Sequence, residues 1–201
     1  MRTVTCMCDK TIDADLPDVV DLDAAPDERD RILDGSFFSL TCPHCGTLLK
    51  PELSVRVRSA SSKLDALVLP EGDRVSFYDG AVEVPAGCEV LVGYAELVER
   101  VAILRDGYEP FAVEVVKYFL LGKAVEAAPD ADIVVTYHGT EEGKLVFYIV
   151  GMKSDETGVV RVPLATYDDI AKDAAGYRAK APFDAIAKGP YKSVNVLETL
   201  E

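Results

Sequence analysis

Thr41-Cys42-Pro43-His44-Cys45-Gly46 is the stretch of sequence that decides how the first part of this chain folds. Two cysteines separated by two residues and followed by glycine are typical of a tight turn that grips one metal ion, because glycine permits the close turn after the second thiolate. A second pair, Cys6-Met7-Cys8, lies near the N-terminus. Its two sulfurs can share one face of an extended segment, since alternate side chains of a strand point the same way. Together the two pairs predict a site with four thiolates.

Zinc is the metal that suits this set of donors, because soft thiolates favour a tetrahedral zinc ion. Four protein ligands leave no open position on the ion, so the predicted site is structural. We expect one zinc ion per chain, bound by Cys6, Cys8, Cys42 and Cys45. The alternative is that these four residues are reduced thiols without a metal. Cys88 stands alone and is expected to be a small, buried apolar residue.

The fold class expected from the hydrophobic pattern is α+β, in two parts. Residues 1–58 are predicted to form a zinc-ribbon-like β module. The gap between its cysteine pairs exceeds that of an ordinary ribbon and holds an acidic insertion with a helix, which Asp23 is expected to cap and Gly35 to end. Residues 59–201 are predicted to form a mixed α+β domain, packed on the module, that contains further strands and a helical hairpin.

Individual elements follow from the period of the apolar residues. Strands are expected at residues 3–8, 37–41, 48–57, 64–69, 74–78, 89–92, 133–137, 145–150, 159–162 and 193–197. Two consecutive helices are expected on either side of Asp106-Gly107, the first beginning near Tyr94 and the second at Pro110. A short helix is expected at residues 167–175, with Gly176 ending it.

Charge and composition restrict the partner and the compartment. The 201-residue chain carries a formal net charge of −14, whereas nucleic acid and anionic membrane surfaces require clustered Lys and Arg. Apolar runs are too short to span a membrane, and the N-terminus lacks the apolar stretch of a signal peptide. We therefore expect a cytoplasmic protein, in which thiols stay reduced. Its expected partner is another protein, and neither nucleic acid nor a membrane.

A thiol–disulfide enzyme is the main alternative function. Cys42-Pro43-His44-Cys45 matches the active site of strongly oxidising thioredoxin-fold proteins, where the reactive thiolate lies at a helix N-terminus. Gly46 and Pro51 leave no room for such a helix. The sequence also lacks the His-x-Glu segment of zinc deaminases and the His-Glu-x-x-His motif of metalloproteases. An oxidoreductase using Cys42 and Cys45 is therefore kept only as the alternative to a non-enzymatic function.

The chain also resembles a known family. The Cys-Pro-x-Cys turn, the upstream Arg31-Ile32-Leu33-Asp34-Gly35-Ser36-Phe37-Phe38 and the N-terminal cysteine pair resemble the CpXC domain family of bacterial proteins, over about the first 125 residues. The resemblance continues through Val92-Gly93-Tyr94-Ala95-Glu96-Leu97 and Arg105-Asp106-Gly107-Tyr108. It implies a zinc-ribbon-like start and no established activity. The single residue between Cys6 and Cys8 departs from the family's usual two-residue spacing. We expect a non-enzymatic, zinc-stabilised protein-interaction module.

Overall fold

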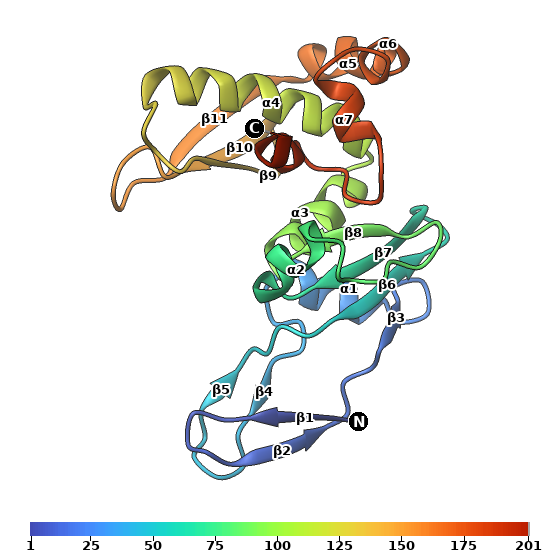
Figure 1. The fold of residues 1–201 in the computed structure, drawn as a ribbon, viewed down its shortest axis with the longest axis vertical. Helices are drawn as coiled ribbons and strands as arrows, with labels where there is room; N and C mark the ends of the chain where they lie inside the picture. Colours follow the sequence, from blue (N-terminus) through green and yellow to red (C-terminus); the bar gives the residue numbers. More distant parts are fainter. Residues whose placement is uncertain (201) are drawn as a thin grey trace. The chain divides into compact units, whose positions relative to one another are not determined.

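The computed structural model describes residues 1–200, with side chains described up to residue 197. It confirms a mixed α+β architecture, with several small sheets and seven α-helices among the described residues (Figure 1). The chain divides into two compact units, Met1–Val101 and Ala102–Glu201. None of the helices within residues 1–200 is long and apolar enough to cross a membrane.

Two short hairpins lie together at one end of the first unit, in the blue and cyan part of Figure 1. In the first hairpin, β1 (Arg2–Thr5) pairs antiparallel with β2 (Thr11–Ala14). In the second, β4 (Leu40–Thr41) pairs antiparallel with β5 (Leu48–Leu49). Each cysteine pair lies in the connection between the two strands of one hairpin. The strand expected at 3–8 ends at Thr5, because the chain turns at the first cysteine pair. The strand expected at 37–41 begins only at Leu40, because the chain turns at Phe38, which has φ 56°.

A four-stranded sheet forms the core of the first unit. Its order is β3 (Val19–Asp21), β6 (Val55–Ser59), β7 (Leu64–Leu69) and β8 (Glu89–Val92). The outer pairs β3–β6 and β7–β8 are parallel, and the central pair β6–β7 is antiparallel. Helix α1 (Pro26–Leu33) contributes the fully buried Ile32, and α3 (Tyr94–Arg105) follows β8 and runs into the second unit. The boundary predicted at residue 58 falls within β6 and remains a prediction about which parts fold independently.

The second unit is built on a three-stranded antiparallel sheet and one long helix. The strand order is β11 (Gly158–Pro163), β10 (Lys144–Val150) and β9 (Val134–Glu141). Helix α4 (Pro110–Ala127) contacts β9 and also the C-terminal elements. These elements are α5 (Leu164–Lys172), α6 (Ala174–Arg178), α7 (Phe183–Ala187) and the 3-10 helix η2 (Val194–Leu200). The helix pair α3 and α4 and the three strands that follow it were expected from the sequence.

Several short elements differ from the expectation. Residues 74–78, expected as a strand, form helix α2 (Arg74–Tyr78), which follows the 3-10 helix η1 (Glu71–Asp73). Residues 193–197, expected as a strand, lie mainly in η2. Five residues with three apolar side chains fit either period, so long-range pairing decides such segments, and neither of these two has a strand partner.

Three predicted element boundaries were also wrong. The strand expected at 48–57 is split into β5 and β6 by a segment that contains Pro51, which lacks the N–H that a sheet requires. Gly176 does not end a helix, since it lies inside α6. Asp23 does not cap α1, whose N-cap is Ala25 without a side-chain hydrogen bond. Its carboxylate instead accepts hydrogen bonds from residues in the β6–β7 turn.

Candidate metal centre

The four cysteine sulfurs of the two hairpins converge on one point. Cys6 Sγ lies 3.6 Å from Cys45 Sγ, and Cys8 Sγ lies 3.8 Å from Cys42 Sγ. All four sulfurs lie within 4.8 Å of one another. A tetrahedral ion bound at about 2.3 Å requires neighbouring sulfurs about 3.8 Å apart. The cluster could therefore hold one tetrahedral metal ion, and the structure brings together all four residues that the sequence singled out.

Both cysteine loops are closed by the same type of backbone hydrogen bond. The N–H of the first cysteine donates to a carbonyl beyond the second cysteine of its pair. Cys6 donates to Lys10 over 2.9 Å, and Cys42 donates to Thr47 over 2.8 Å. The Cys-x-Cys loop is one residue shorter but closes on the same plan as the Cys-x-x-Cys loop.

The residue after each pair reverses the chain. Asp9 has φ 61° and Gly46 has φ 76°, both in the left-handed region. The N–H of Asp9 donates to the carbonyl of Cys6, and the N–H of Gly46 donates to the carbonyl of Cys42, each over 2.9 Å. Glycine adopts this conformation readily, whereas aspartate is one of the few other residues that tolerate it. Gly46 therefore has the role expected from the sequence, and Asp9 has the same role in the shorter loop.

The thiols of the cluster differ in acidity. The backbone N–H of Cys8 lowers the pKa of Cys6, but burial and contacts with the thiols of Cys8, Cys42 and Cys45 outweigh it and raise this pKa to about 12. Burial also raises the pKa of Cys8. The hydroxyl and the backbone N–H of Thr47 lower the pKa of Cys45 to about 6. A bound cation would favour the thiolate form of all four residues and release their protons.

Very little apolar surface is buried around the cluster. Within residues 1–16 and 40–53, all of which the structure describes, the buried side chains are Val4, Cys6 and Cys42. Three such side chains cannot offset the conformational entropy of ordering two hairpins. The arrangement of the hairpins therefore depends on the sulfur cluster rather than on a hydrophobic core.

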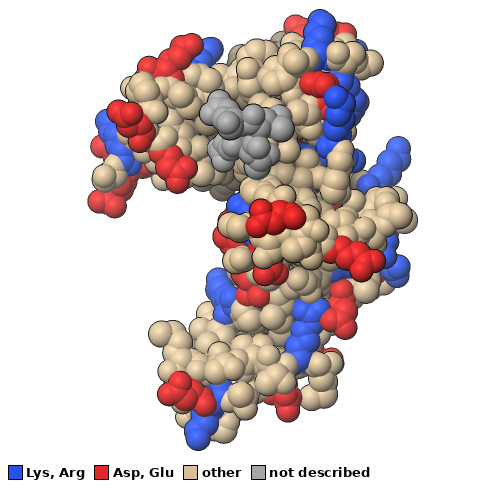
Figure 2. Space-filling model, in the orientation of Figure 1, with Lys and Arg blue, Asp and Glu red and all other residues tan. Residues whose placement is uncertain are grey.

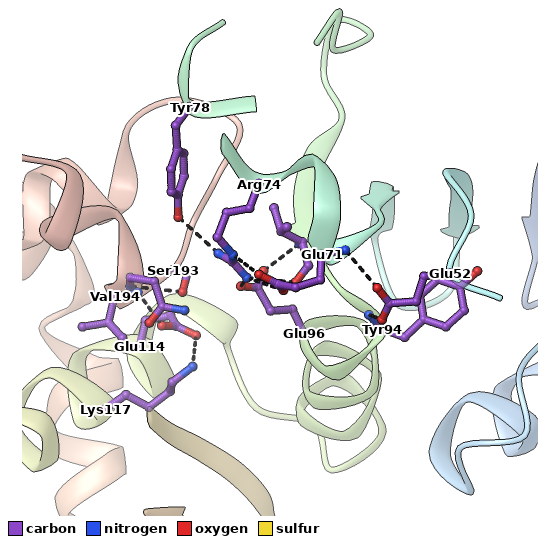
Figure 3. Close-up of polar contacts among 12 residues, drawn as sticks. Glu52, Glu71, Arg74, Tyr78, Tyr94, Glu96, Glu114, Lys117, Ser193 and Val194 are labelled. Carbon is purple, nitrogen blue, oxygen red and sulfur yellow. Dashed lines mark hydrogen bonds and ion pairs between the residues drawn. The ribbon is translucent and has the colours of Figure 1, made fainter. Parts of the chain in front are cut away.

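Aromatic and carboxylate contacts hold the second hairpin against Tyr94, the first residue of α3. The ring of Tyr94 lies 5.3 Å from that of Phe37 and 6.2 Å from that of Phe38, both of which are buried. Its hydroxyl accepts from the N–H of Leu53 and lies 3.2 Å from the Leu53 carbonyl. The carboxylate of Glu52 accepts from the N–H of Tyr94 (Figure 3). Tyr94 thus anchors the chain on both sides of the β4–β5 hairpin.

A polar network beside β7 and β8 was not expected from the sequence. Arg74 donates to the carboxylates of Glu71 and Glu96, and Glu96 accepts from the N–H of Val92 (Figure 3). These groups satisfy one another, so the network supports the fold. The pairs Glu71–Arg74 and Val92–Glu96 are local, but the contact between Arg74 and Glu96 joins residues 22 positions apart, which no spacing could have predicted.

A buried ion pair in the second unit was also missed. Lys117 Nζ lies 3.0 Å from Glu114 Oε1 on α4, and each side chain is only 3% exposed. The other oxygen of Glu114 accepts from the N–H of Val194 over 2.7 Å (Figure 3). The three-residue spacing of opposite charges on one helix face was the available signal. Glu114 therefore connects α4 to the start of η2.

Cys88 is buried, as predicted, and lies outside the cluster. Its Sγ donates to a carboxylate oxygen of Asp65 over 3.3 Å. Asp65 in turn accepts two hydrogen bonds from Arg56. This thiol lies immediately before β8 and contacts a residue of β7, so its substitution can serve as a control for changes in the four clustered thiols.

These observations define an α+β protein with a four-cysteine candidate metal centre, and comparison with known proteins gives its family. The family model described as "CpXC protein" matches residues 4–117, more than half of the chain and all four clustered cysteines. The chain belongs to the CpXC family, which confirms the resemblance in its sequence. A protein of Treponema pallidum (strain Nichols), described as an uncharacterized protein, is 28% identical over 216 residues, covering 96% of each chain. No solved structure matches this chain significantly.

Proposed function

We propose that this chain is a non-enzymatic protein in which four thiolates hold one structural zinc ion, and that it acts by binding another protein. The main observation that supports the metal site is that four sulfurs lie within 4.8 Å of one another, in two hairpins that have almost no apolar core. Cys6, Cys8, Cys42 and Cys45 would hold the ion. Zinc is favoured over other divalent ions because all four donors are soft thiolates.

The zinc ion would supply a tetrahedral cross-link between the two hairpins. With four protein ligands it has no position for water or substrate, so the site would not be hydrolytic. Each loop contributes two sulfurs, and the backbone N–H groups around them offset the negative charge of the thiolates. Binding free energy at such a site is folding free energy for the segment that it connects.

A protein partner is supported by the exposed apolar side chains beside the cysteines. Met7, between Cys6 and Cys8, is 91% exposed, and Leu48, in β5, is 59% exposed. The net charge of −14 disfavours nucleic acid. On the face shown in Figure 2, Asp and Glu lie among the Lys and Arg side chains over the hairpins. We assign the protein to the cytoplasm because paired thiols stay reduced there.

The oxidoreductase alternative finds no support among the described residues. Cys42 and Cys45 lie in the turn between β4 and β5, and no helix begins there. The helix N-terminus that lowers the pKa of a catalytic thiol in thioredoxin-fold enzymes is therefore missing from this pair.

Metal analysis of the purified full-length protein tests the metal site. We expect about one zinc per chain, retained through gel filtration and removed by a strong chelator. Alkylation of the cluster should be slow before chelation and fast afterwards. Protein that contains no zinc when purified without chelator, and takes up none when zinc is added, would exclude the site.

The partner surface is tested by substitution of the exposed apolar residues. Crosslinking in native cells should recover a defined protein with the wild-type chain and lose it with a Met7→Asp, Leu48→Asp double variant. Val159→Asp is the matched control, because Val159 is also an exposed apolar strand residue but lies in β11. Equal loss in both variants, or no loss in either, would reject this surface.

A further inference from the structure

We infer that Cys45 is an oxidation site for hydrogen peroxide, and that a Cys6–Cys45 disulfide then forms and releases the bound metal. This inference rests on the proposed zinc site, because it describes how that site is opened. It adds a chemical modification, the residue that takes it and the residue that resolves it.

Solvent access distinguishes Cys45 from the other three ligands. Cys6 and Cys42 are 2% and 1% exposed, and Cys8 is partly buried. Cys45 is exposed, and so are its neighbours His44, Gly46 and Thr47. Oxidation of cysteine by a small solute follows thiolate character and exposure. Peroxide should therefore reach Cys45 before any other sulfur of the cluster.

The neighbouring sulfur decides which disulfide follows. Cys6 Sγ lies 3.6 Å from Cys45 Sγ, in direct contact, although the two residues are 39 positions apart in the chain. Cys8 Sγ makes its own contact with Cys42 Sγ at 3.8 Å. A short movement brings Cys6 Sγ and Cys45 Sγ to the S–S bond length of about 2.05 Å. The resolving thiolate is therefore Cys6, from the opposite hairpin.

The chemistry balances with one peroxide molecule per disulfide. The Cys45 thiolate attacks one oxygen of hydrogen peroxide, the O–O bond breaks, and hydroxide leaves, which gives a sulfenic acid at Cys45. The Cys6 thiolate then attacks Cys45 Sγ, an S–S bond forms, the S–O bond breaks, and a second hydroxide leaves. Two thiolates have lost two electrons to one peroxide, and the two hydroxides take up protons to become water.

Loss of the metal follows from the change in donors. The sulfurs of Cys6 and Cys45 no longer carry the charge that binds the ion, and only those of Cys8 and Cys42 remain. Because residues 1–16 and 40–53 bury little apart from cysteines, each hairpin should loosen when the ion leaves, while the Cys6–Cys45 disulfide keeps the two hairpins joined. The four-stranded sheet has its own buried core and should persist. Peroxide would thus loosen the hairpins selectively.

The experiment uses the full-length, zinc-loaded Cys88→Ala protein, in which the four clustered thiols are the only ones. Hydrogen peroxide is added stepwise, released zinc is followed with a chromophoric chelator, and disulfides are mapped by mass spectrometry. We expect zinc release in step with a Cys6–Cys45 disulfide, and sulfenic acid trapping at Cys45. A first disulfide within one pair, Cys6–Cys8 or Cys42–Cys45, would overturn the inference, as would zinc that stays bound at peroxide concentrations that oxidise free cysteine.

Variants separate this inference from the proposed function. Cys45→His keeps four donors but removes the oxidisable sulfur, and it should slow zinc release at least about tenfold. Cys88→Ala alone should release zinc at the wild-type rate within about twofold, because Cys88 lies outside the cluster. If Cys45→His fails to bind zinc, mapping at partial release in the Cys88→Ala protein decides the order of oxidation. Protein that never binds zinc rejects the proposed function, whereas zinc-loaded protein that resists peroxide rejects this inference alone.

Discussion

Asp9 and Gly46 hold the same left-handed backbone conformation at equivalent points of the two cysteine loops. Each follows the second cysteine of its pair and donates its N–H to the carbonyl of the first. A side chain makes this conformation unfavourable, by roughly 1–2 kcal/mol for most residues and by less for aspartate. The Cys-x-Cys loop therefore closes with some residual strain that the Cys-x-x-Cys loop avoids by using glycine.

Exchanging these residues should change zinc affinity in opposite directions. Gly46→Ala should weaken zinc binding about tenfold, because a left-handed alanine costs roughly 1–2 kcal/mol. No atom lies within 4 Å of the added Cβ, so the cost is conformational and not steric. Asp9→Gly should strengthen binding modestly. Competition with a chelator of known affinity measures both variants, and a shift of both in the same direction would contradict the equivalence of the two loops.

Removal of one of the four clustered thiols should unfold the hairpins and leave the four-stranded and three-stranded sheets intact. In Cys42→Ser, amides of residues 1–16 and 40–53 should exchange with solvent at nearly unprotected rates, because the proposed zinc ion would order these segments. Amides of β6, β7 and β10 should stay protected. Hydrogen exchange with mass spectrometry resolves these segments. Cys88→Ala serves as the control and should leave hairpin protection unchanged, so similar exchange in both variants would count against a structural metal.

Neutralising one member of the buried ion pair on α4 should destabilise the protein more than neutralising both members. Glu114→Gln takes the carboxylate away from the buried Lys117 ammonium and should cost about 3–5 kcal/mol in the free energy of unfolding. Adding Lys117→Met should recover part of this loss, since a buried pair replaced by apolar or neutral groups is often tolerated. Urea unfolding followed by circular dichroism measures both. A double variant less stable than Glu114→Gln would show that the ammonium has a role independent of Glu114.

Asp23 should make stability depend on acid pH. The hydroxyl of Ser61, its N–H and the hydroxyl of Ser59 all donate to this carboxylate and hold its pKa well below the usual range. A lowered folded-state pKa means that its stabilising effect is complete above the unfolded pKa of about 3.9 and is lost as the pH falls below it.

The urea midpoint of Asp23→Asn should therefore lie below that of wild type at pH 7, and the two should approach each other below about pH 3.9. Ser61→Ala, which removes the principal donor, should show the same convergence to a smaller extent. If the difference in urea midpoint between Asp23→Asn and wild type stays constant down to pH 2.5, the charge of Asp23 contributes nothing to stability.

Long elements of this fold could be predicted from the sequence, whereas several short elements could not. The long apolar helix that begins at Pro110 and the strands after it were predicted, because a strong period over many residues outweighs local ambiguity. Residues 74–78 were predicted as a strand and form α2, since five residues are too few to distinguish the period of a strand from that of a helix. Asp23 had the composition of a helix cap but instead bonds to Ser59 and Ser61, which lie more than thirty positions away. Such pairings appear only when the chain is folded.

The sequence by itself determined the chemistry of the candidate centre: four thiolates in two close pairs, one pair followed by glycine, within a CpXC chain. Residue type and local spacing are enough for that, because each loop closes within its own few residues. Only the tertiary structure decided that Cys6 meets Cys45 and that Cys45 is the exposed cysteine of the cluster. These depend on how two separate hairpins pack together, and on which sulfur the packing leaves open to solvent.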